Sequence, residues 1–242
     1  MVKNLKIFAH RGASENYPEN TLLAFKKAVE LGVDGIELDV HLTKDKKLVV
    51  IHDETTKRTS DKEWKICERT LDELKTVDVG RWKSFYGEKI PTFDEVLEIA
   101  GSKTVVNVEI KNGPVFYRGI EEEVIKTLKK QGRLESTIIS SFDHFSVRRV
   151  KKLEGRSRVG VLFSLRSPYI SYIAKKVSAE FINIHKNYVV RNDILKLTKK
   201  GFKIMVWEVS SLKEAEWLAD ASVWGIFTNN PALFSKKVKR LL

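Results

Sequence analysis

Short runs of apolar, β-branched residues alternate along the chain with longer segments in which apolar residues recur at helical spacing. The runs predict strands at 6–10, 35–40, 104–111, 137–142, 158–163, 181–185, 203–209 and 225–228. The intervening and final segments predict helices at 21–31, 93–100, 119–131, 145–153, 168–177, 191–200, 211–219 and 231–241. Eight strands, each followed by a helix, indicate a parallel α/β fold and predict a closed (β/α)8 barrel.

Two segments after the second strand break this alternation. The apolar run at 48–51 follows strand 35–40 too closely for a helical crossover, so we expect the chain to turn at 44–47 and return as a β-hairpin. Residues 53–90 are mainly polar and predict a small insertion over one rim of the barrel. We therefore expect a single domain over residues 1–242 that carries this hairpin and insertion.

The composition narrows the class of protein. One cysteine in 242 residues excludes an internal disulfide framework. The chain has no stretch long and apolar enough for a membrane span and no signal-peptide pattern at its start, so we expect a cytoplasmic protein. The net charge of +12 fits a solvated basic surface or attraction to an anionic ligand. Because no nucleic-acid-binding motif is present, we expect no nucleic-acid partner; these features leave the oligomeric state open.

Ionisable residues gather at the carboxyl ends of the predicted strands, where the active site of a (β/α)8 barrel lies. They are His10, Arg11, Glu37, Asp39, His52, Glu109 and Lys111. Residues two apart on a strand point to the same side, so Glu37 and Asp39 share one face of their strand. Glu109 and Lys111 repeat that spacing on the next parallel strand. The pattern predicts a functional site at this end of the barrel.

Three of these residues, Glu37, Asp39 and Glu109, lie within apolar runs, where an unpaired charge costs several kcal/mol. A divalent cation would neutralise them. Because all three are hard oxygen ligands and no thiolate accompanies them, the set favours Mg²⁺ or Ca²⁺ over Zn²⁺. The structural alternative is an internal salt-bridge cluster with Arg11 and Lys111.

Two aromatic residues and three further histidines need separate interpretations. Phe142 and Trp207 fall at the same rim and would form an apolar wall against the substrate, the alternative being ordinary core packing.

His41 is expected on the emerging hairpin, and His144 at the start of a helix. His185 ends a strand, from which it would look toward the pocket. We expect these three histidines to be structural.

Four short motifs occur in a specific order: HRG at 10–12, ExD at 37–39, HD at 52–53 and ExK at 109–111. They lie within or beside HRGASENYPENT (10–21), GVDGIELDVHLTKDKKLVVIHDE (32–54), RTLDELKTVDVG (69–80), IPTFDEVLE (90–98), VEIK (108–111), SSF (140–142), VWEV (206–209) and GIFTNNP (225–231). Through these segments, which extend over nearly the whole chain, the sequence resembles the glycerophosphodiester phosphodiesterase family.

The resemblance implies a TIM barrel and a hydrolase that splits glycerophosphodiesters into an alcohol and sn-glycerol 3-phosphate with a divalent metal ion. It implies a small-molecule substrate drawn from lipid and glycerol metabolism. It further implies metal ligands at Glu37, Asp39 and Glu109, catalytic histidines at His10 and His52, and phosphate-binding cations at Arg11 and Lys111.

One position departs from the family pattern. Asn229 stands where members often carry an aspartate, a change that would alter the charge of the pocket or its substrate end. It touches none of the implied metal or histidine positions.

Elementary phosphate chemistry agrees with these roles. A metal ion, Arg11 and Lys111 would withdraw negative charge from a phosphodiester as it builds up in the transition state. His10 and His52 would move the two protons of hydrolysis, although the sequence does not show which is the acid. Two alternatives remain: a related lipid phosphodiesterase of the phospholipase type, which an exposed apolar loop would favour, and a non-catalytic anion-binding barrel, against which the histidine pair argues.

Overall fold

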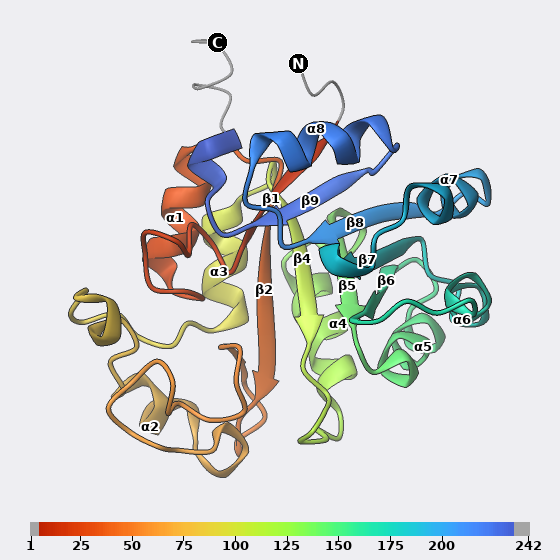
Figure 1. The fold of residues 1–242 in the computed structure, drawn as a ribbon. Helices are drawn as coiled ribbons and strands as arrows, with labels where there is room; N and C mark the ends of the chain where they lie inside the picture. Colours follow the sequence, from red (N-terminus) through yellow and green to blue (C-terminus); the bar gives the residue numbers. More distant parts are fainter. Residues whose placement is uncertain (1–4, 235–242) are drawn as a thin grey trace.

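The computed structural model describes residues 5–234, which form a barrel of parallel strands surrounded by helices (Figure 1). The strands are β1 (Lys6–His10), β2 (Gly35–Leu42), β3 (Leu48–Val50), β4 (Val105–Ile110), β5 (Thr137–Ser141), β6 (Arg158–Phe163), β7 (Phe181–His185), β8 (Lys203–Trp207) and β9 (Gly225–Thr228). All except β3 run parallel, and pairing of β1 with both β9 and β2 closes the barrel. The predicted TIM-barrel fold is confirmed.

The described helices agree with the predicted order, with one unpredicted addition, α2 (Leu71–Lys75), in the insertion. The others are α1 (Leu22–Glu30), α3 (Phe93–Ala100), α4 (Ile120–Lys130), α5 (His144–Leu153), α6 (Ile170–Lys176), α7 (Arg191–Lys199) and α8 (Leu212–Asp220). Threonine side chains cap three of these helices: Thr21 accepts from the backbone of Ala24, and Thr70 and Thr92 form capping boxes with Glu73 and Glu95. Such caps satisfy backbone N–H groups that have no partner within the helix.

The last predicted helix, 231–241, is described only at its beginning. Residues Pro231–Phe234 form one turn of 3-10 helix, and the rest of the predicted segment lies outside the described residues. Within 5–234, no helix is long and apolar enough to cross a membrane.

The hairpin and the insertion extend the barrel at one end. Strand β3 pairs antiparallel with β2, Val40 opposite Val50, as the short spacing predicted. The following residues hold α2 and two 3-10 turns, Ile66–Glu68 and Arg81–Lys83, which the polar composition did not reveal. A small apolar core that includes Ile66 and Leu74 anchors them to β3. Figure 1 shows this segment beyond the carboxyl end of β2, which the arrowhead marks.

Inside the barrel, the side chains form two layers of different character. The lower layer is apolar and includes Phe8, Phe181 and Met205. Gly35 leaves room for this layer, because a Cβ atom there would lie 2.3 Å from the ring of Phe8. Two residues further along most of the strands, inward positions carry polar or charged side chains instead. The apolar layer therefore lies beneath a polar site at the carboxyl ends of the strands.

Candidate active site

Strand register brings the predicted residues to one level of the barrel. His10 of β1 lies opposite Glu37 of β2, and Asp39 of β2 lies opposite Glu109 of β4. Eight of the nine predicted site residues line a pocket of about 120 Å³: His10, Arg11, Glu37, His52, Glu109, Lys111, Phe142 and Trp207. The ninth, Asp39, is 1% exposed and forms ion pairs with two of them.

The three acidic residues form a compact buried cluster. One carboxylate oxygen each of Glu37, Asp39 and Glu109 lies within 4.8 Å of the others. Burial, together with the charges of Asp39 and Glu109, raises the pKa of Glu37 well above its usual value. Burial and Asp39 likewise raise the pKa of Glu109, although Lys111 opposes this. The cluster therefore carries more negative charge than its protein surroundings neutralise.

Two cations lie against this cluster. Lys111 Nζ is 2.8 Å from Glu109 Oε1 and 3.3 Å from Asp39 Oδ1, while Arg11 Nε is 3.5 Å from Asp39 Oδ2. Burial alone would raise the pKa of Asp39, but Lys111 and Arg11 hold it well below its usual range. Arg11 is shared with Glu19, whose Oε1 accepts from Nη1 at 3.0 Å. The two cations thus balance Asp39 better than Glu37.

His10 sits at the end of β1 in a network of neutral and acidic partners. Its Nδ1 lies 2.8 Å from Asn229 Oδ1, so the expectation that position 229 touches neither histidine is wrong. The Asn229 amide nitrogen donates to Glu208 Oε1 at 2.7 Å, so its oxygen faces His10, and His10 Nδ1 is the donor. The other ring nitrogen, Nε2, faces Glu37 at 3.8 Å. Burial and Arg11 lower the pKa of His10 to about 4.

His52 follows β3 and has a different partner. Its Nδ1 lies 2.5 Å from Asp53 Oδ1, a carboxylate where His10 has an amide. Burial would raise the pKa of Asp53, but hydrogen bonds from Arg58 and His52 lower it to about 2. Arg58 also binds both carboxylate oxygens of Glu19 at 2.8 Å. This bridge ties the insertion to the loop that follows β1.

The pocket floor presents amide groups without protein partners. Both polar side-chain atoms of Asn183 and the oxygen of Asn107 have no hydrogen-bond partner among the described residues, although both side chains are at most 1% exposed. Both residues line the pocket, and so does Trp207, whose indole nitrogen is also buried and unpartnered. Phe142 packs edge-on against Trp207, with 5.8 Å between ring centroids. The floor thus offers polar groups to a ligand beside an aromatic wall.

The remaining histidines take part in packing and hydrogen bonds outside the pocket. His41 is buried, binds the hydroxyl of Tyr117 through Nδ1, and donates from Nε2 to the backbone oxygen of His52. His144 Nε2 lies 3.1 Å from a backbone oxygen. His185 packs edge-on against Trp207, with 4.7 Å between ring centroids, and is not among the pocket-lining residues.

Several site residues were not identified from the sequence. Asn20 donates from its side chain to Asp39 at 2.8 Å, and Glu19 and Arg58 link the loop after β1 to the insertion. Asn107 and Asn183 form the polar floor. The only available signal was position, because Asn107 precedes Glu109 by two residues and therefore shares its side of β4.

Comparison with known proteins identifies relatives over almost the entire chain. Residues 10–233 match the family described as glycerophosphoryl diester phosphodiesterase. A glycerophosphodiester phosphodiesterase of Caldanaerobacter subterraneus is 42% identical over 237 residues, which are 97% of this chain and 98% of the relative. These matches agree with the order of the sequence motifs.

Solved structures agree in both fold and extent. A phosphodiesterase of Oleispira antarctica, solved in complex with the product sn-glycerol-3-phosphate, has a TM-score of 0.87 at 26% identity and covers 97% of this chain and 95% of its own. A glycerophosphodiester phosphodiesterase of Thermotoga maritima has a TM-score of 0.80 at 30% identity, with 98% of each chain covered.

Proposed function

The chain belongs to the glycerophosphoryl diester phosphodiesterase family and is an enzyme, and we propose that it uses a divalent metal ion and two histidines to hydrolyse glycerophosphodiesters to an alcohol and sn-glycerol 3-phosphate. The observation that carries the proposal is the buried cluster of three carboxylates, flanked by Arg11 and Lys111, in the pocket that both histidines line. An enzyme of this class is favoured over a non-catalytic anion-binding barrel.

The donor set fits a divalent cation. Glu37, Asp39 and Glu109 would hold it, since they supply three oxygen ligands and have a combined charge that their neighbours do not cancel. Oxygen ligands without nitrogen or sulfur suit Mg²⁺ or Ca²⁺. When bound, the ion would supply positive charge for the nonbridging oxygens of the phosphate.

Arg11 and Lys111 complete the phosphate site. Both side chains are largely buried, with 19% and 13% of their surfaces exposed, and both line the pocket. A cation in such a position strengthens its attraction to phosphate because little water screens it. Their carboxylate partners hold them in place before the substrate arrives.

The histidines have unlike partners and therefore suit unlike proton transfers. His10 donates from Nδ1 to an amide, which leaves Nε2 of the neutral ring as an acceptor for the proton of the attacking hydroxyl. His52 has the carboxylate of Asp53 at Nδ1, which orients the ring so that its other nitrogen faces away from Asp53 and can give a proton to the leaving alcohol. The attacking oxygen forms the new bond to phosphorus as the bond to the leaving oxygen breaks. Attack by water gives sn-glycerol 3-phosphate directly, whereas attack by the free hydroxyl of the glycerol group would give a cyclic phosphate that a water molecule must then open.

The polar floor favours the glycerol end of the substrate. Asn107 and Asn183 can hydrogen-bond to free hydroxyl groups, and Trp207 offers an apolar wall beside them. The backbone glycerol of a diacyl phospholipid carries acyl chains in place of free hydroxyls, so it would leave these buried amides without partners. We therefore expect glycerophosphodiesters to react much faster than diacyl phospholipids or nucleic acids.

The decisive experiment is a hydrolysis assay over a panel of glycerophosphodiesters with choline, ethanolamine and glycerol head groups. The purified enzyme is assayed after chelation and after addition of Mg²⁺, Ca²⁺ or Mn²⁺. Activity that vanishes with chelator and returns with metal is expected. Full activity in a demonstrably metal-free preparation would contradict the metal-dependent proposal, and comparable rates on vesicles of a diacyl lipid would favour a related lipid phosphodiesterase.

A further inference from the structure

Six large apolar side chains are exposed at the same end of the barrel as the candidate site. They are Phe116, Phe145, Leu165, Tyr169, Tyr188 and Val190, which we call the aromatic rim, and they are 36% to 76% exposed. They lie on the connections after β4 to β7 or in the first helical turn that follows. Single exposed apolar residues are common, but six on four successive connections form a surface that water solvates poorly.

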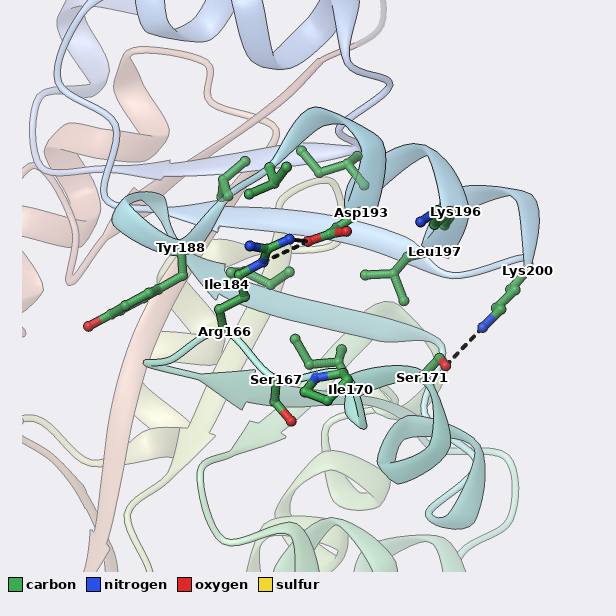
Figure 2. A pocket seen from close by; sticks show the side chains of 14 residues that line it. Arg166, Ser167, Ile170, Ser171, Ile184, Tyr188, Asp193, Lys196, Leu197 and Lys200 are labelled. Atoms are coloured by element: carbon green, nitrogen blue, oxygen red, sulfur yellow. Dashed lines mark hydrogen bonds and ion pairs between the residues drawn. The ribbon is translucent and has the colours of Figure 1, made fainter.

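The aromatic rim opens into a groove between α6 and α7 (Figure 2). The groove has a volume of about 510 Å³, and its apolar lining includes Ile170, Ile184 and Leu197. The helix α6 has only seven residues and follows a non-helical stretch, 164–169, and Ile184 of β7 lines the groove. Figure 2 shows Arg166 and Asp193 paired across the groove, with Tyr188 pointing away from them. This volume lies in the usual range for ligand pockets.

Arginines flank the exposed apolar side chains. Arg118 follows Phe116 by two residues, and Arg148 lies one helical turn after Phe145, on the same face of α5. Both arginines are exposed, and within residues 5–234 neither has a carboxylate at ion-pair distance. The four connections at 112–119, 142–149, 164–170 and 186–193 contain six Lys and Arg residues but only two Asp and no Glu.

We propose that the aromatic rim docks the enzyme on an anionic lipid surface. The arginines would lie at the level of the lipid phosphates, and the aromatic side chains would enter the interface, where amphipathic rings are favoured. The α6–α7 groove would receive one acyl chain from that surface. Docking in this orientation turns the active pocket toward the lipid, because both lie at the carboxyl ends of the strands.

A fluid lipid surface fits this rim better than a protein partner does. No two rings of the aromatic rim contact each other in the described part of the chain; Tyr188, for example, packs on His185 instead. Protein interfaces concentrate their energy in a contiguous, closely packed centre. Separated apolar side chains beside unpaired arginines instead match a surface that can rearrange around each of them.

Sedimentation with sucrose-loaded vesicles tests this proposal, and it does not require any catalytic activity. We expect the wild-type chain to bind phosphatidylglycerol vesicles and to bind phosphatidylcholine vesicles far more weakly. Replacement of Phe116, Phe145 and Tyr169 together by serine should weaken binding to phosphatidylglycerol at least about tenfold. The double variant Arg118→Gln/Arg148→Gln should weaken it about tenfold as well, with reduced salt dependence.

Matched variants separate docking from general effects. Lys103→Gln/Lys199→Gln removes the same charge from exposed positions after α3 and at the end of α7, on the opposite face of the barrel, and should bind like wild type. Tyr86→Ser/Trp217→Ser removes exposed aromatic rings outside the rim and should also bind normally. Every variant should hydrolyse soluble glycerophosphocholine at the wild-type rate.

Three outcomes would overturn the proposal. They are absence of wild-type binding to phosphatidylglycerol, equal loss of binding in the rim and control variants, and a dimer in sedimentation velocity that the rim substitutions dissociate. The last result would assign the rim to contact between two copies of the chain. Vesicle binding without hydrolysis of any glycerophosphodiester would contradict the proposed function and leave the docking proposal standing.

Discussion

The open end of the barrel has two unlike sides. On the side of β1, β2 and β4, the charges are buried, and Arg11 and Lys111 both have carboxylate partners. On the side of α5 to α7, the connections expose Phe145 and Tyr169, and Arg148 stands in solvent without an ion pair in the described residues. One end of the barrel therefore carries buried, ion-paired charges on one side and exposed, unpaired charges on the other.

This difference has a physical origin. A buried charge is tolerated only where neighbouring groups or a ligand compensate it, so the ionisable residues of the site are confined to strand ends that fix their positions. Exposed apolar and cationic groups cost little individually, and loops of varied shape can carry them. We therefore expect substitutions on the charged side to affect chemistry strongly and substitutions on the aromatic side to leave chemistry intact.

The largest effect is expected at the carboxylate cluster. Glu109→Gln should reduce kcat/KM for glycerophosphocholine by about 10³-fold or more, because Glu109 is a proposed metal ligand and the stabilisation that a bound ion would supply is worth several kcal/mol. Thermal stability measured in chelator should stay the same or rise, since one of three mutually repelling carboxylates is removed. Activity within tenfold of wild type at saturating Mg²⁺ would show that this residue is not needed to hold the ion.

The histidines should give the next largest effect. His10→Ala and His52→Ala should each lose about 10²- to 10⁴-fold in kcat, with metal binding and thermal stability little changed. If the pair acts as a unit, the double variant should lose much less than the product of the single losses. The wild-type rate should fall at both low and high pH. Near-normal turnover of His52→Ala across the pH range would contradict the pairing of His10 with His52.

Leaving-group chemistry can separate the roles of the two histidines. A glycerophosphodiester with a nitrophenol leaving group needs little protonation to depart. His52→Ala should therefore lose less activity on this substrate than on glycerophosphocholine, whereas His10→Ala should lose similar activity on both. The reverse pattern would exchange the acid and base between the two residues.

A smaller effect is expected from the amide on β7. Asn183→Leu keeps the volume and removes two buried polar atoms without protein partners, so the thermal midpoint should rise. At the same time kcat/KM should fall about tenfold, mainly through KM, if Asn183 binds a substrate hydroxyl. Asn112→Leu is the matched control: Asn112 is buried and fully hydrogen-bonded, so its replacement should lower stability. Unchanged kinetics of Asn183→Leu would remove this residue from the substrate site.

The smallest effect concerns acid stability on the charged side. The pKa of Asp53 is about 2 in the folded chain, below its unfolded value of about 4, so the stabilisation it brings is complete above pH 4 and is lost as the pH falls toward 2. Asp53→Asn should make urea unfolding less dependent on pH across that interval. If the free energy of unfolding of Asp53→Asn falls as steeply below pH 4 as that of wild type, another carboxylate is responsible for the acid sensitivity.

Some features follow directly from residue order. Strand and helix periods predicted eight β/α units, and the short spacing between 35–40 and 48–51 required an antiparallel return. Alternation along a strand placed Glu37 with Asp39, and Glu109 with Lys111, on common sides. Local rules sufficed because each of these relations spans only a few residues.

Tertiary structure decided which distant groups meet. Asn229 binds His10 across 219 positions, and Arg58 binds Glu19 across 39 positions, through contacts that no local period encodes. The floor of the site depends on Asn183, which reads in the sequence as one polar residue in an apolar strand. Barrel closure turns that position inward and sets it beside Trp207. Residue order sets the strands and the side of each strand on which a residue lies, whereas barrel closure sets which side chains from different strands share the enclosed space.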